Sequence, residues 1–409
     1  MEIKNKKAII IGCGIAGPAL ALQLKRAGIK STIYEAEKTP SDLGLFIYLS
    51  PNGMNVIRSL GVYEKIKKLG IETYAYIFYN EKGKQLGNLD YSNEDERFGA
   101  SNVMLRRSLL YKTVREEAIN QGIDIQFGKK LKDIEIINSE KVIAHFEDGV
   151  TAEGNFLIGC DGLRSRTRKI IIPDTPKPRY DGIVATGGFS KISINPRLPN
   201  TFYSSFLNGA GVAHLTSKNG ETFWWLSVTY PEEPTKEELN LISNDQWKQK
   251  LLDLCNGAHP VYKKFIDEHK GDFPKIPLYD IDFLETWHKG PVCLVGDAAH
   301  PTSPHVGQGA SMALEDSITL AKCLRDLEDT QQAFAKFQSL RKERTEKMIK
   351  FSRLSGESLH LTNPIKKWFR DLMLSMFTKP FFLKHPLPGD RFDMNFFFGY
   401  KVDWDEKIK

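Results

Sequence analysis

Three short segments of this sequence, one rich in glycine and two that join glycine to aspartate, suit a phosphorylated ligand. The first is GCGIAG, in which Gly12, Gly14 and Gly17 stand at the G-x-G-x-x-G spacing around Ile15 and Ala16. The first glycine of this motif permits a tight turn, the second lets the backbone approach a pyrophosphate, and the third lets a helix pack on the preceding strand. The segment therefore predicts a pyrophosphate site.

The other segments extend this site. Glu35, followed by Ala36, ends a predicted strand at 31–34, where a carboxylate can accept hydrogen bonds from ribose hydroxyls. Asp161-Gly162 and Gly296-Asp297 each follow a predicted buried strand. Because the carboxyl ends of parallel strands meet at the ligand crevice of a doubly wound sheet, these segments predict one long cofactor held along its length.

The elements that must position these residues alternate as in an α/β domain. Apolar runs at 8–11, 156–160 and 291–295 predict buried parallel strands, with helices after the first glycine loop, at 107–121 and after Gly309. Alternation at 72–90 predicts a hairpin, followed by a polar loop at 91–99.

The stretch 180–270 has a different pattern. Aromatic-rich runs separated by glycines predict an antiparallel sheet, and 235–269 reads as helical. An aromatic sheet face suits either ordinary core or the wall of a cavity for a flat apolar ligand, and the sequence favours neither.

The C-terminal part is predicted to be helical at 330–361 and 364–377, with an irregular tail from 386 to 409. An apolar stripe on the second helix favours a helix docked on its own protein. The alternative is a peripheral membrane helix, because basic residues surround the stripe: Lys366, Lys367, Arg370 and Lys379.

Composition limits the class of protein. The chain has 409 residues, 41% of them hydrophobic, and this length allows two domains. Its net charge of +6 favours anionic ligands. We expect no nucleic-acid partner, because the basic residues form no extended cluster. Five scattered cysteines without C-x-x-C spacing favour free thiols in a cytoplasmic protein and argue against a metal site. No apolar run is long enough to suggest a transmembrane helix.

The sequence contains GCGIAG with Glu35, then CDGLRSRTR from Cys160 to Arg168, and then GDAAHPTSPHVGQGASMALED from Gly296 to Asp316. In this order, the three segments resemble those of the group A FAD-dependent monooxygenases, the para-hydroxybenzoate hydroxylase-like family. The resemblance covers most of the chain up to Arg344. It implies an α/β fold in which an FAD-binding, Rossmann-like doubly wound sheet carries an inserted mixed or antiparallel β-sheet substrate domain and C-terminal helices. The expected domains are an FAD-binding domain (1–75, 100–177 and 275–345), a substrate domain (76–99 and 178–274) and a C-terminal helical region (346–409).

The resemblance also implies roles for residues. Glu35 would bind the adenosine ribose, the glycines from Gly12 to Gly17 the pyrophosphate, and Asp297 the ribityl chain, while Asp161-Gly162 would serve both FAD and NAD(P)H. The residues expected beside the isoalloxazine ring, at a helix N-terminus that can stabilise negative charge, are Pro304, Gly307, Gln308, Gly309 and Ala310.

The family also has an arginine that touches FAD, three residues before a leucine. Arg106 and Arg107 both satisfy this spacing. We prefer Arg107, because Val114 continues its apolar spacing, and we expect Arg106 to be a surface charge.

Four residues are candidates for substrate contact or for lining the flavin pocket: His214, Trp225, Pro304 and His305. His300 is expected to support its loop. No side chain is assigned as a catalytic acid or base, because that role depends on geometry.

The resemblance implies that NADH or NADPH reduces FAD and that O2 then gives a flavin hydroperoxide. This species would hydroxylate or epoxidise a small, aromatic or polycyclic organic substrate, in a monomer or homodimer. The alternatives are an FAD-dependent reductase, a halogenase of the same fold group, and a non-catalytic flavin- or ligand-binding protein. The halogenase motif W-x-W-x-I-P is not matched at Trp224-Trp225-Leu226.

Overall fold

The three glycine-acid segments lie at one edge of a six-stranded sheet in a computed structural model that describes residues 6–40, 44–191, 200–379, 383 and 393–408. Five of its strands run parallel, and β18 pairs antiparallel at the edge. The strands, in spatial order, are β18 (His288–Lys289), β19 (Val292–Leu294), β12 (Phe156–Gly159), β1 (Lys7–Ile11), β2 (Lys30–Tyr34) and β8 (Asp124–Gln126). The parallel strands predicted from the apolar runs are confirmed.

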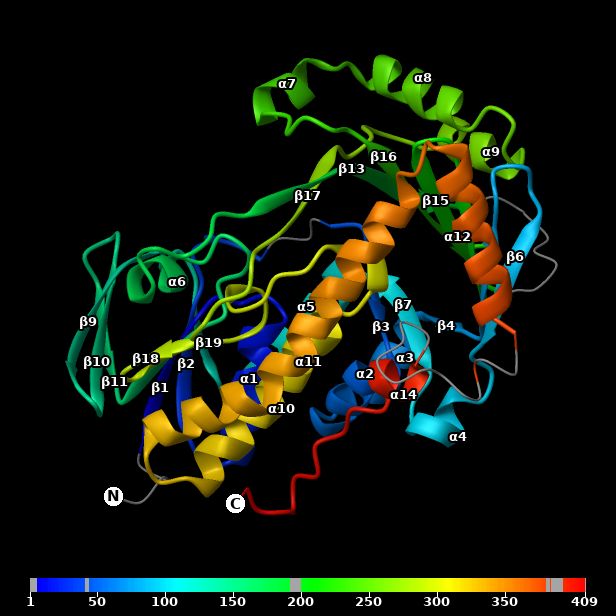
Figure 1. Cartoon of the computed structure of the whole chain (residues 1–409). Coiled ribbons are helices and arrows are strands. Elements are labelled where there is room, and N and C mark those ends of the chain that lie inside the picture. Colours follow the sequence, from blue (N-terminus) through cyan, green and yellow to red (C-terminus); the bar gives the residue numbers. More distant parts are fainter. Residues whose placement is uncertain (1–5, 41–43, 192–199, 380–382, 384–392, 409) are drawn as a thin grey trace.

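The two faces of this sheet are covered differently (Figure 1). Helices α1 (Ala16–Arg26), α5 (Arg107–Asn120) and α10 (Gly309–Asp326) lie on one side. On the other side is the antiparallel sheet of β9 (Leu131–Asn138), β10 (Lys141–Phe146) and β11 (Thr151–Gly154), followed by α6 (Arg166–Ile171). The ring of Phe146 stacks on that of Tyr34 at 4.7 Å. β9 was not predicted, because most of its residues are exposed and it shows no apolar alternation.

A second, seven-stranded sheet forms the other large layer. It is mixed, because β14 and β5 pair in parallel. Its strands, in spatial order, are β17 (Ile276–Asp280), β13 (Arg179–Ser190), β16 (Thr222–Thr229), β15 (Ala210–Thr216), β14 (Thr201–Phe206), β5 (Ala75–Tyr79) and β6 (Gln85–Asp90). β17 belongs to this sheet although it lies within the range 275–345 predicted for the FAD-binding domain.

Helices α7 (Lys236–Leu241), α8 (Asn244–Leu254) and α9 (Val261–Asp267) cover one face of the second sheet. Trp224, Trp247 and Phe265 are fully buried between them and the strands. The helical stretch predicted at 235–269 is therefore three short helices.

A small antiparallel sheet packs against the second sheet through Met104 and Phe223. Its strands are β3 (Phe46–Leu49), β7 (Asn102–Arg106) and β4 (Ile71–Thr73), and its helices are α2 (Pro51–Ser59), α3 (Tyr63–Leu69) and α4 (Glu94–Phe98). The loop predicted at 91–99 is wrong, because α4 forms there and buries Glu94 and Phe98. Its polar composition hides this burial from sequence reasoning.

The long helix α11 (Thr330–Leu359) runs from the parallel sheet to the second sheet (Figure 1). Between α10 and β19 lie two 3-10 turns, η2 (Gly296–Ala298) and η3 (Pro304–Val306). The tail contains α14 (Met394–Phe398), so the prediction of an irregular tail is wrong there, and residues 386–392 and 409 of that prediction lie outside the described residues.

Helix α12 (Pro364–Phe377) begins where predicted, because the Asn363 side chain accepts hydrogen bonds from the backbone N–H groups of Ile365 and Lys366. It docks on the protein as predicted, and Phe377 at the end of the predicted stripe packs against the core. The earlier residues of the stripe face outward, with Ile365 and Trp368 77% and 64% exposed. Among the described residues, no helix combines the length and hydropathy needed to span a bilayer.

Candidate active site

A cavity of about 1310 Å³ lies between the carboxyl edge of the parallel strands and the uncovered face of the second sheet. The predicted cofactor residues that line it are Gly12, Gly14, Ile15, Ala16, Glu35, Ala36, Arg107, Asp161, Gly162, Asp297, Pro304, Gly307, Gly309 and Ala310. Gly17, Gly296 and Gln308 do not line it. The fold thus brings segments that are far apart in the sequence to one space.

The three glycines of the first loop serve different purposes. Gly12 has a φ of +105°, and a Cβ there would lie 2.5 Å from the carbonyl oxygen of Cys160. A Cβ on Gly17 would lie 2.0 Å from the carbonyl oxygen of Gly12, so this position is needed for packing of α1 on β1. A Cβ on Gly14 would meet no protein atom within 4 Å. Gly14 therefore leaves room for whatever occupies the cavity.

Glu35 is held at the end of β2 with its carboxylate at the cavity. Its Oε2 accepts a hydrogen bond from the backbone N–H of Cys13 at 2.7 Å, and its Oε1 accepts one from the backbone N–H of Glu37 at 2.9 Å. A carboxylate has about four lone-pair sites, so it retains capacity for the hydroxyls of a ribose.

Asp161 mainly shapes its own loop. Its carboxylate accepts hydrogen bonds from the Ser165 hydroxyl at 2.6 Å and from the backbone N–H and hydroxyl of Thr167 at 2.9 and 3.0 Å. Burial raises the pKa of Asp161, and these hydrogen bonds oppose that rise. The neighbouring Gly162 has a φ of +75° and space around it, so its backbone is open to the cavity.

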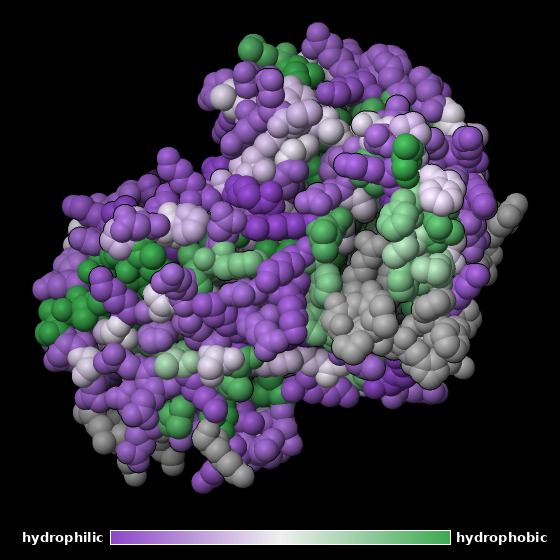
Figure 2. All heavy atoms as spheres, in the orientation of Figure 1, coloured by the Kyte–Doolittle hydropathy of each residue, from purple (hydrophilic) through white to green (hydrophobic). Residues whose placement is uncertain are grey.

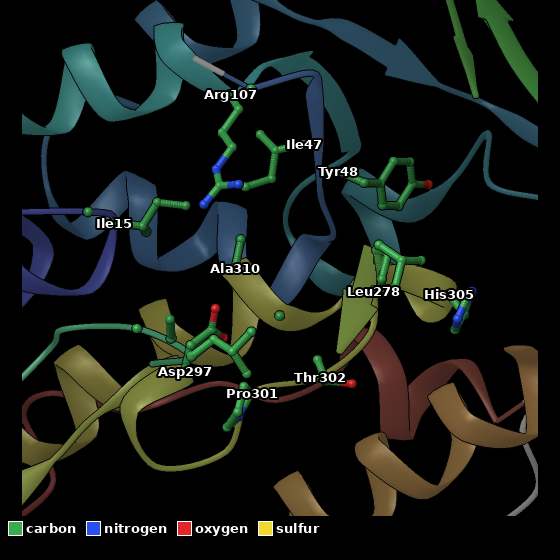
Figure 3. Close-up of a pocket in the computed structure, with 18 of the residues that line it drawn as sticks. Ile15, Ile47, Tyr48, Arg107, Leu278, Asp297, Pro301, Thr302, His305 and Ala310 are labelled. Carbon is green, nitrogen blue, oxygen red and sulfur yellow. The ribbon is translucent and has the colours of Figure 1, made fainter. Parts of the chain in front are cut away.

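Asp297 and Arg107 face the cavity from opposite sides (Figure 3). Burial raises the pKa of Asp297, and the charges of His300 and Arg107 oppose this rise. The Arg107 guanidinium, held by a 2.7 Å hydrogen bond from its Nε to the Tyr111 hydroxyl, points toward Ala310. An acidic and a basic side chain therefore face one another across the space.

The structure distinguishes Arg107 from Arg106. Arg106 pairs with Glu221 at 3.1 Å and lies over the ring of Phe189 at 3.9 Å, and it is not part of the cavity wall. The preference for Arg107 is supported by this placement.

The turn before α10 supplies backbone to the cavity. Gly309 and Ala310 begin the helix, whose first N–H groups have no partner within the helix and carry the positive end of its dipole. Gln308 points elsewhere: its amide donates to the Ser50 hydroxyl at 2.8 Å and accepts from Asn52 at 3.0 Å. Its side chain therefore ties the turn to α2, and only the neighbouring residues reach the cavity.

His300 supports its loop, as expected. Its Nε2 lies 2.6 Å from Oδ2 of Asp316, which also accepts a hydrogen bond from the backbone N–H of Gly296 at 2.9 Å. Both side chains are almost fully buried. This contact fixes the turn that carries Asp297.

His305 reaches the cavity and joins the two halves of the molecule. Its Nε2 lies 3.0 Å from Oδ2 of Asp181, a residue of β13 that also accepts a hydrogen bond from the Ser303 hydroxyl at 2.7 Å. Pro304 lies beside it on the cavity wall.

The two substrate candidates on the second sheet lie on opposite faces. Trp225 lines the cavity, and its Nε1 donates to the Ser227 hydroxyl at 2.8 Å. His214 points to the other face, where it packs against Tyr262 and Phe265, and burial lowers its pKa to about 3. The structure therefore does not support His214 as a substrate contact.

Sequence reasoning left open whether the aromatic sheet face lines a cavity, and apart from Trp225 it named no aromatic residue as part of the site. The aromatic residues of the far wall of the cavity are Tyr48, Tyr76, Phe78, Tyr91, Phe202, Phe206, Phe397 and Phe398. The alternation of β5 and β14 was a signal for some of them, because one face of each strand supplies the lining. Glu94, fully buried behind Tyr48 and Tyr91, gave no signal. Burial raises its pKa to about 7, partly offset by Arg97.

The residues present fit an FAD molecule. Gly14 leaves space at the loop where a pyrophosphate would lie, Glu35 offers acceptors for a ribose, and Asp297 faces an arginine across the cavity. The fold and the site together define a dinucleotide-binding protein with an aromatic chamber beside the cofactor.

Comparison with known proteins agrees with this class. The model of the FAD binding domain family matches residues 5–352. Aurachin C monooxygenase/isomerase of Stigmatella aurantiaca is 27% identical over 90% of this chain and 93% of its own length. 6-Hydroxynicotinate 3-monooxygenase of Pseudomonas fluorescens is 28% identical over 89% and 94%. The structure of Klebsiella pneumoniae HpxO with FAD and uric acid is 26% identical, covers 90% of this chain and 92% of its own, and has a TM-score of 0.81.

The chain belongs to the FAD binding domain family. It is an FAD-dependent monooxygenase of the group A, aromatic hydroxylase type, with NAD(P)H as reductant. The predicted fold, with its Rossmann-like sheet, inserted mixed sheet and C-terminal helices, is confirmed.

Proposed function

We propose that this enzyme hydroxylates a flat, aromatic or polycyclic organic molecule bound in the aromatic part of the cavity. The observation that carries this proposal is the wall opposite the cofactor residues, where Tyr76, Phe202 and Trp225 come from three strands of one sheet face. Aromatic rings stack on flat ligands and exclude water from them. Epoxidation of a polycyclic ring remains within the same proposal.

Residues of this chain have distinct roles in the proposed reaction. Gly12, Gly14 and Glu35 bind the adenosine diphosphate part of FAD, and Asp297 and Arg107 orient its other end. FAD, when bound, supplies the redox and oxygen chemistry with NADH or NADPH and O2 as co-substrates. The first N–H groups of α10 favour negative charge beside Ala310.

His305 lies on the cavity wall, and a histidine ring can donate or accept a hydrogen bond. Its Nε2 is hydrogen-bonded to the Asp181 carboxylate, which fixes the ring orientation. We propose that it contacts the substrate or the edge of the cofactor site, together with Pro304 and Trp225.

We further propose a cytoplasmic enzyme that works as a monomer or homodimer. The five cysteines are all buried free thiols, which is typical of proteins from a reducing compartment. The domain limits given above stay proposals, with β17 moved to the substrate domain.

A substrate screen tests the proposal. Purified protein is expected to contain FAD and to oxidise NADH or NADPH faster when the right aromatic or polycyclic compound is added, with a product that gains one oxygen atom from 18O2. A reductase would give a product without added oxygen, and a halogenase would require halide. Protein that is colourless and cannot be reconstituted with FAD would contradict the whole proposal.

A further inference from the structure

Four large apolar side chains of helix α12 face the outside of the protein. Ile365, Trp368, Phe369 and Leu372 are 77%, 64%, 56% and 46% exposed. Their spacing of three and four residues places them on one stripe. Figure 2 shows hydrophobic residues gathered on the surface at the position of α12. Single exposed apolar residues are common, but a continuous stripe on one helix indicates an interaction surface.

The orientation of α12 is fixed by polar contacts on its other face. Arg370 is 7% exposed, pairs with Asp371 at 2.7 Å, donates to the carbonyl oxygen of Ser358 at 3.2 Å and lies 4.0 Å from the ring centroid of Phe206. These contacts hold the apolar stripe outward.

Lys367 makes a second set of polar contacts that hold the apolar stripe outward. The Nζ of Lys367 lies 2.8 Å from Oε2 of Glu81 and 2.9 Å from Oδ1 of Asn208. The arginine and this lysine therefore point inward, where an ordinary amphipathic helix would place its apolar residues.

The charge around the stripe is positive. Lys366 and Lys379 are exposed at the two ends of the helix, and within the described residues neither makes an ion pair. The one acidic residue of α12, Asp371, is paired with Arg370. A stripe of aromatic and aliphatic residues flanked by exposed lysines is complementary to a membrane surface, which has an apolar interior and anionic headgroups.

The same helix forms part of the cavity wall. Arg370 and Leu374, on its inner face, line the cavity that holds the proposed substrate site. The family model ends at residue 352, so α12 lies beyond the part of the chain that the family description accounts for.

We propose that α12 is an interfacial helix that docks this enzyme onto an anionic lipid bilayer. Its apolar stripe lies at the boundary between headgroups and acyl chains, and Lys366 and Lys379 contact the anionic headgroups. Docking places the wall of the substrate cavity next to the membrane. A symmetric dimer through this face would bring the lysines of two copies together, and the acidic residue of the helix is already paired, so a second copy is the less favourable occupant.

Co-sedimentation of the holoenzyme with vesicles tests this proposal. We expect the enzyme to pellet with phosphatidylcholine–phosphatidylglycerol vesicles, and to pellet less with phosphatidylcholine alone or at high salt. Trp368→Gln combined with Phe369→Gln should lower the binding constant at least about tenfold, and Lys366→Glu combined with Lys379→Glu should abolish the preference for anionic lipid.

The chain offers matched controls. Leu241 on α7 is 82% exposed and Lys68 is exposed on α3, so Leu241→Gln and Lys68→Glu make the same chemical changes elsewhere and should leave binding unchanged. Sedimentation needs no turnover, so this test is independent of the proposed function.

Three results would overturn the proposal. The first is a holoenzyme that stays in the supernatant with the anionic vesicles. The second is equal binding by the Trp368 and Phe369 double variant. The third is a dimer, seen by light scattering, that the same double variant converts to a monomer, because the stripe would then belong to a contact between two copies.

Discussion

Helices α10 and α12 differ in the kinds of side chain that they bury. In α10, 14 of 18 residues are buried, and two of them are the carboxylates of Glu315 and Asp316. In α12, only Arg370 and Leu374 of 14 residues are buried. Helix α10 therefore buries charged side chains, and helix α12 exposes apolar ones. In both helices the partners of the charged groups determine which side chains are buried.

The charges of α10 are paired by α11. Arg341 contacts Glu315 at 2.6 Å and Asp316 at 2.7 Å, and Arg344 contacts Glu315 at 2.8 Å. Burial alone would raise the pKa of both carboxyls. For Glu315 the charges of the two arginines outweigh burial, and its pKa falls below its usual range. For Asp316 the charges of His300 and Arg341 have the same effect on its pKa. This network holds the α10 N-terminus and the Asp297 turn beside the cofactor site.

The largest effect is expected from breaking this network. Arg341→Met leaves two buried carboxylates short of a partner, and the free energy of unfolding should fall by about 3–5 kcal/mol. Urea denaturation measures this loss. Lys347→Met, which removes the exposed pair with Glu343, should cost no more than about 0.5 kcal/mol. Equal costs for the two variants would show that burial does not govern these pairs.

Glu94 is a buried carboxyl whose arginine partner, Arg97, is exposed and lies 3.5 Å away, and it should behave in the opposite way. The pKa of Glu94 is raised from 4.5 to about 7, so the folded state favours its neutral form. The contribution of Glu94 to the free energy of unfolding is complete below pH 4.5. It falls as the pH rises toward 7 and stays low above that pH, and the total loss of free energy of unfolding is at most about 3 kcal/mol.

Glu94→Gln should remove this loss, so that stability changes less between pH 5 and pH 8 than in the parent. Urea denaturation at both pH values tests it, with the exposed Glu96→Gln as the control. A parent and a Glu94→Gln variant with the same pH dependence would mean that Glu94 is ionised in the folded state.

The adjacent arginines at the start of α5 give a matched pair for the cofactor site. Arg107→Ala should weaken FAD binding at least about tenfold, because it removes a charged hydrogen-bond donor from the cavity. Arg106→Ala should leave FAD binding unchanged, because that side chain pairs with Glu221 outside the cavity. Fluorescence titration of the two apoproteins with FAD measures both, and the reverse ranking would transfer the role to Arg106.

The smallest effect is expected on the outer face of α12. Trp368→Gln should change the free energy of unfolding by no more than about 0.5 kcal/mol, since the side chain is mostly exposed. Leu374→Ala, on the inner face of the same helix, should cost about 2 kcal/mol or more. Thermal or urea unfolding compares them. A large loss for Trp368→Gln would place the stripe against the protein in solution.

The cofactor half could be predicted from the sequence in detail. The glycine spacing, the buried strands and the terminal acids are local signals, and in a parallel sheet they converge whatever the rest of the chain does. Gln308 was misplaced because its neighbours reach the cavity, whereas its own side chain finds Ser50 and Asn52, which are distant in sequence.

The substrate half could be predicted only in outline. Strand alternation separates two faces of a sheet but does not say which one meets the cavity, so Trp225 and His214 received equal weight. Helical periodicity in the same way finds the stripe of α12 but not its direction, which depends on Glu81, Asn208 and Ser358. The buried α4 was missed because its composition is that of a loop.

The central claim is that the space beside the first glycine loop is occupied by FAD. Gly14→Val tests it most directly, because a Cβ at this position would meet no protein atom within 4 Å and the backbone there has no positive φ. We predict that the apoprotein variant unfolds at the same temperature as the parent apoprotein but binds FAD at least about a hundredfold more weakly, by titration. A Gly14→Val variant that folds and binds FAD like the parent would contradict the account.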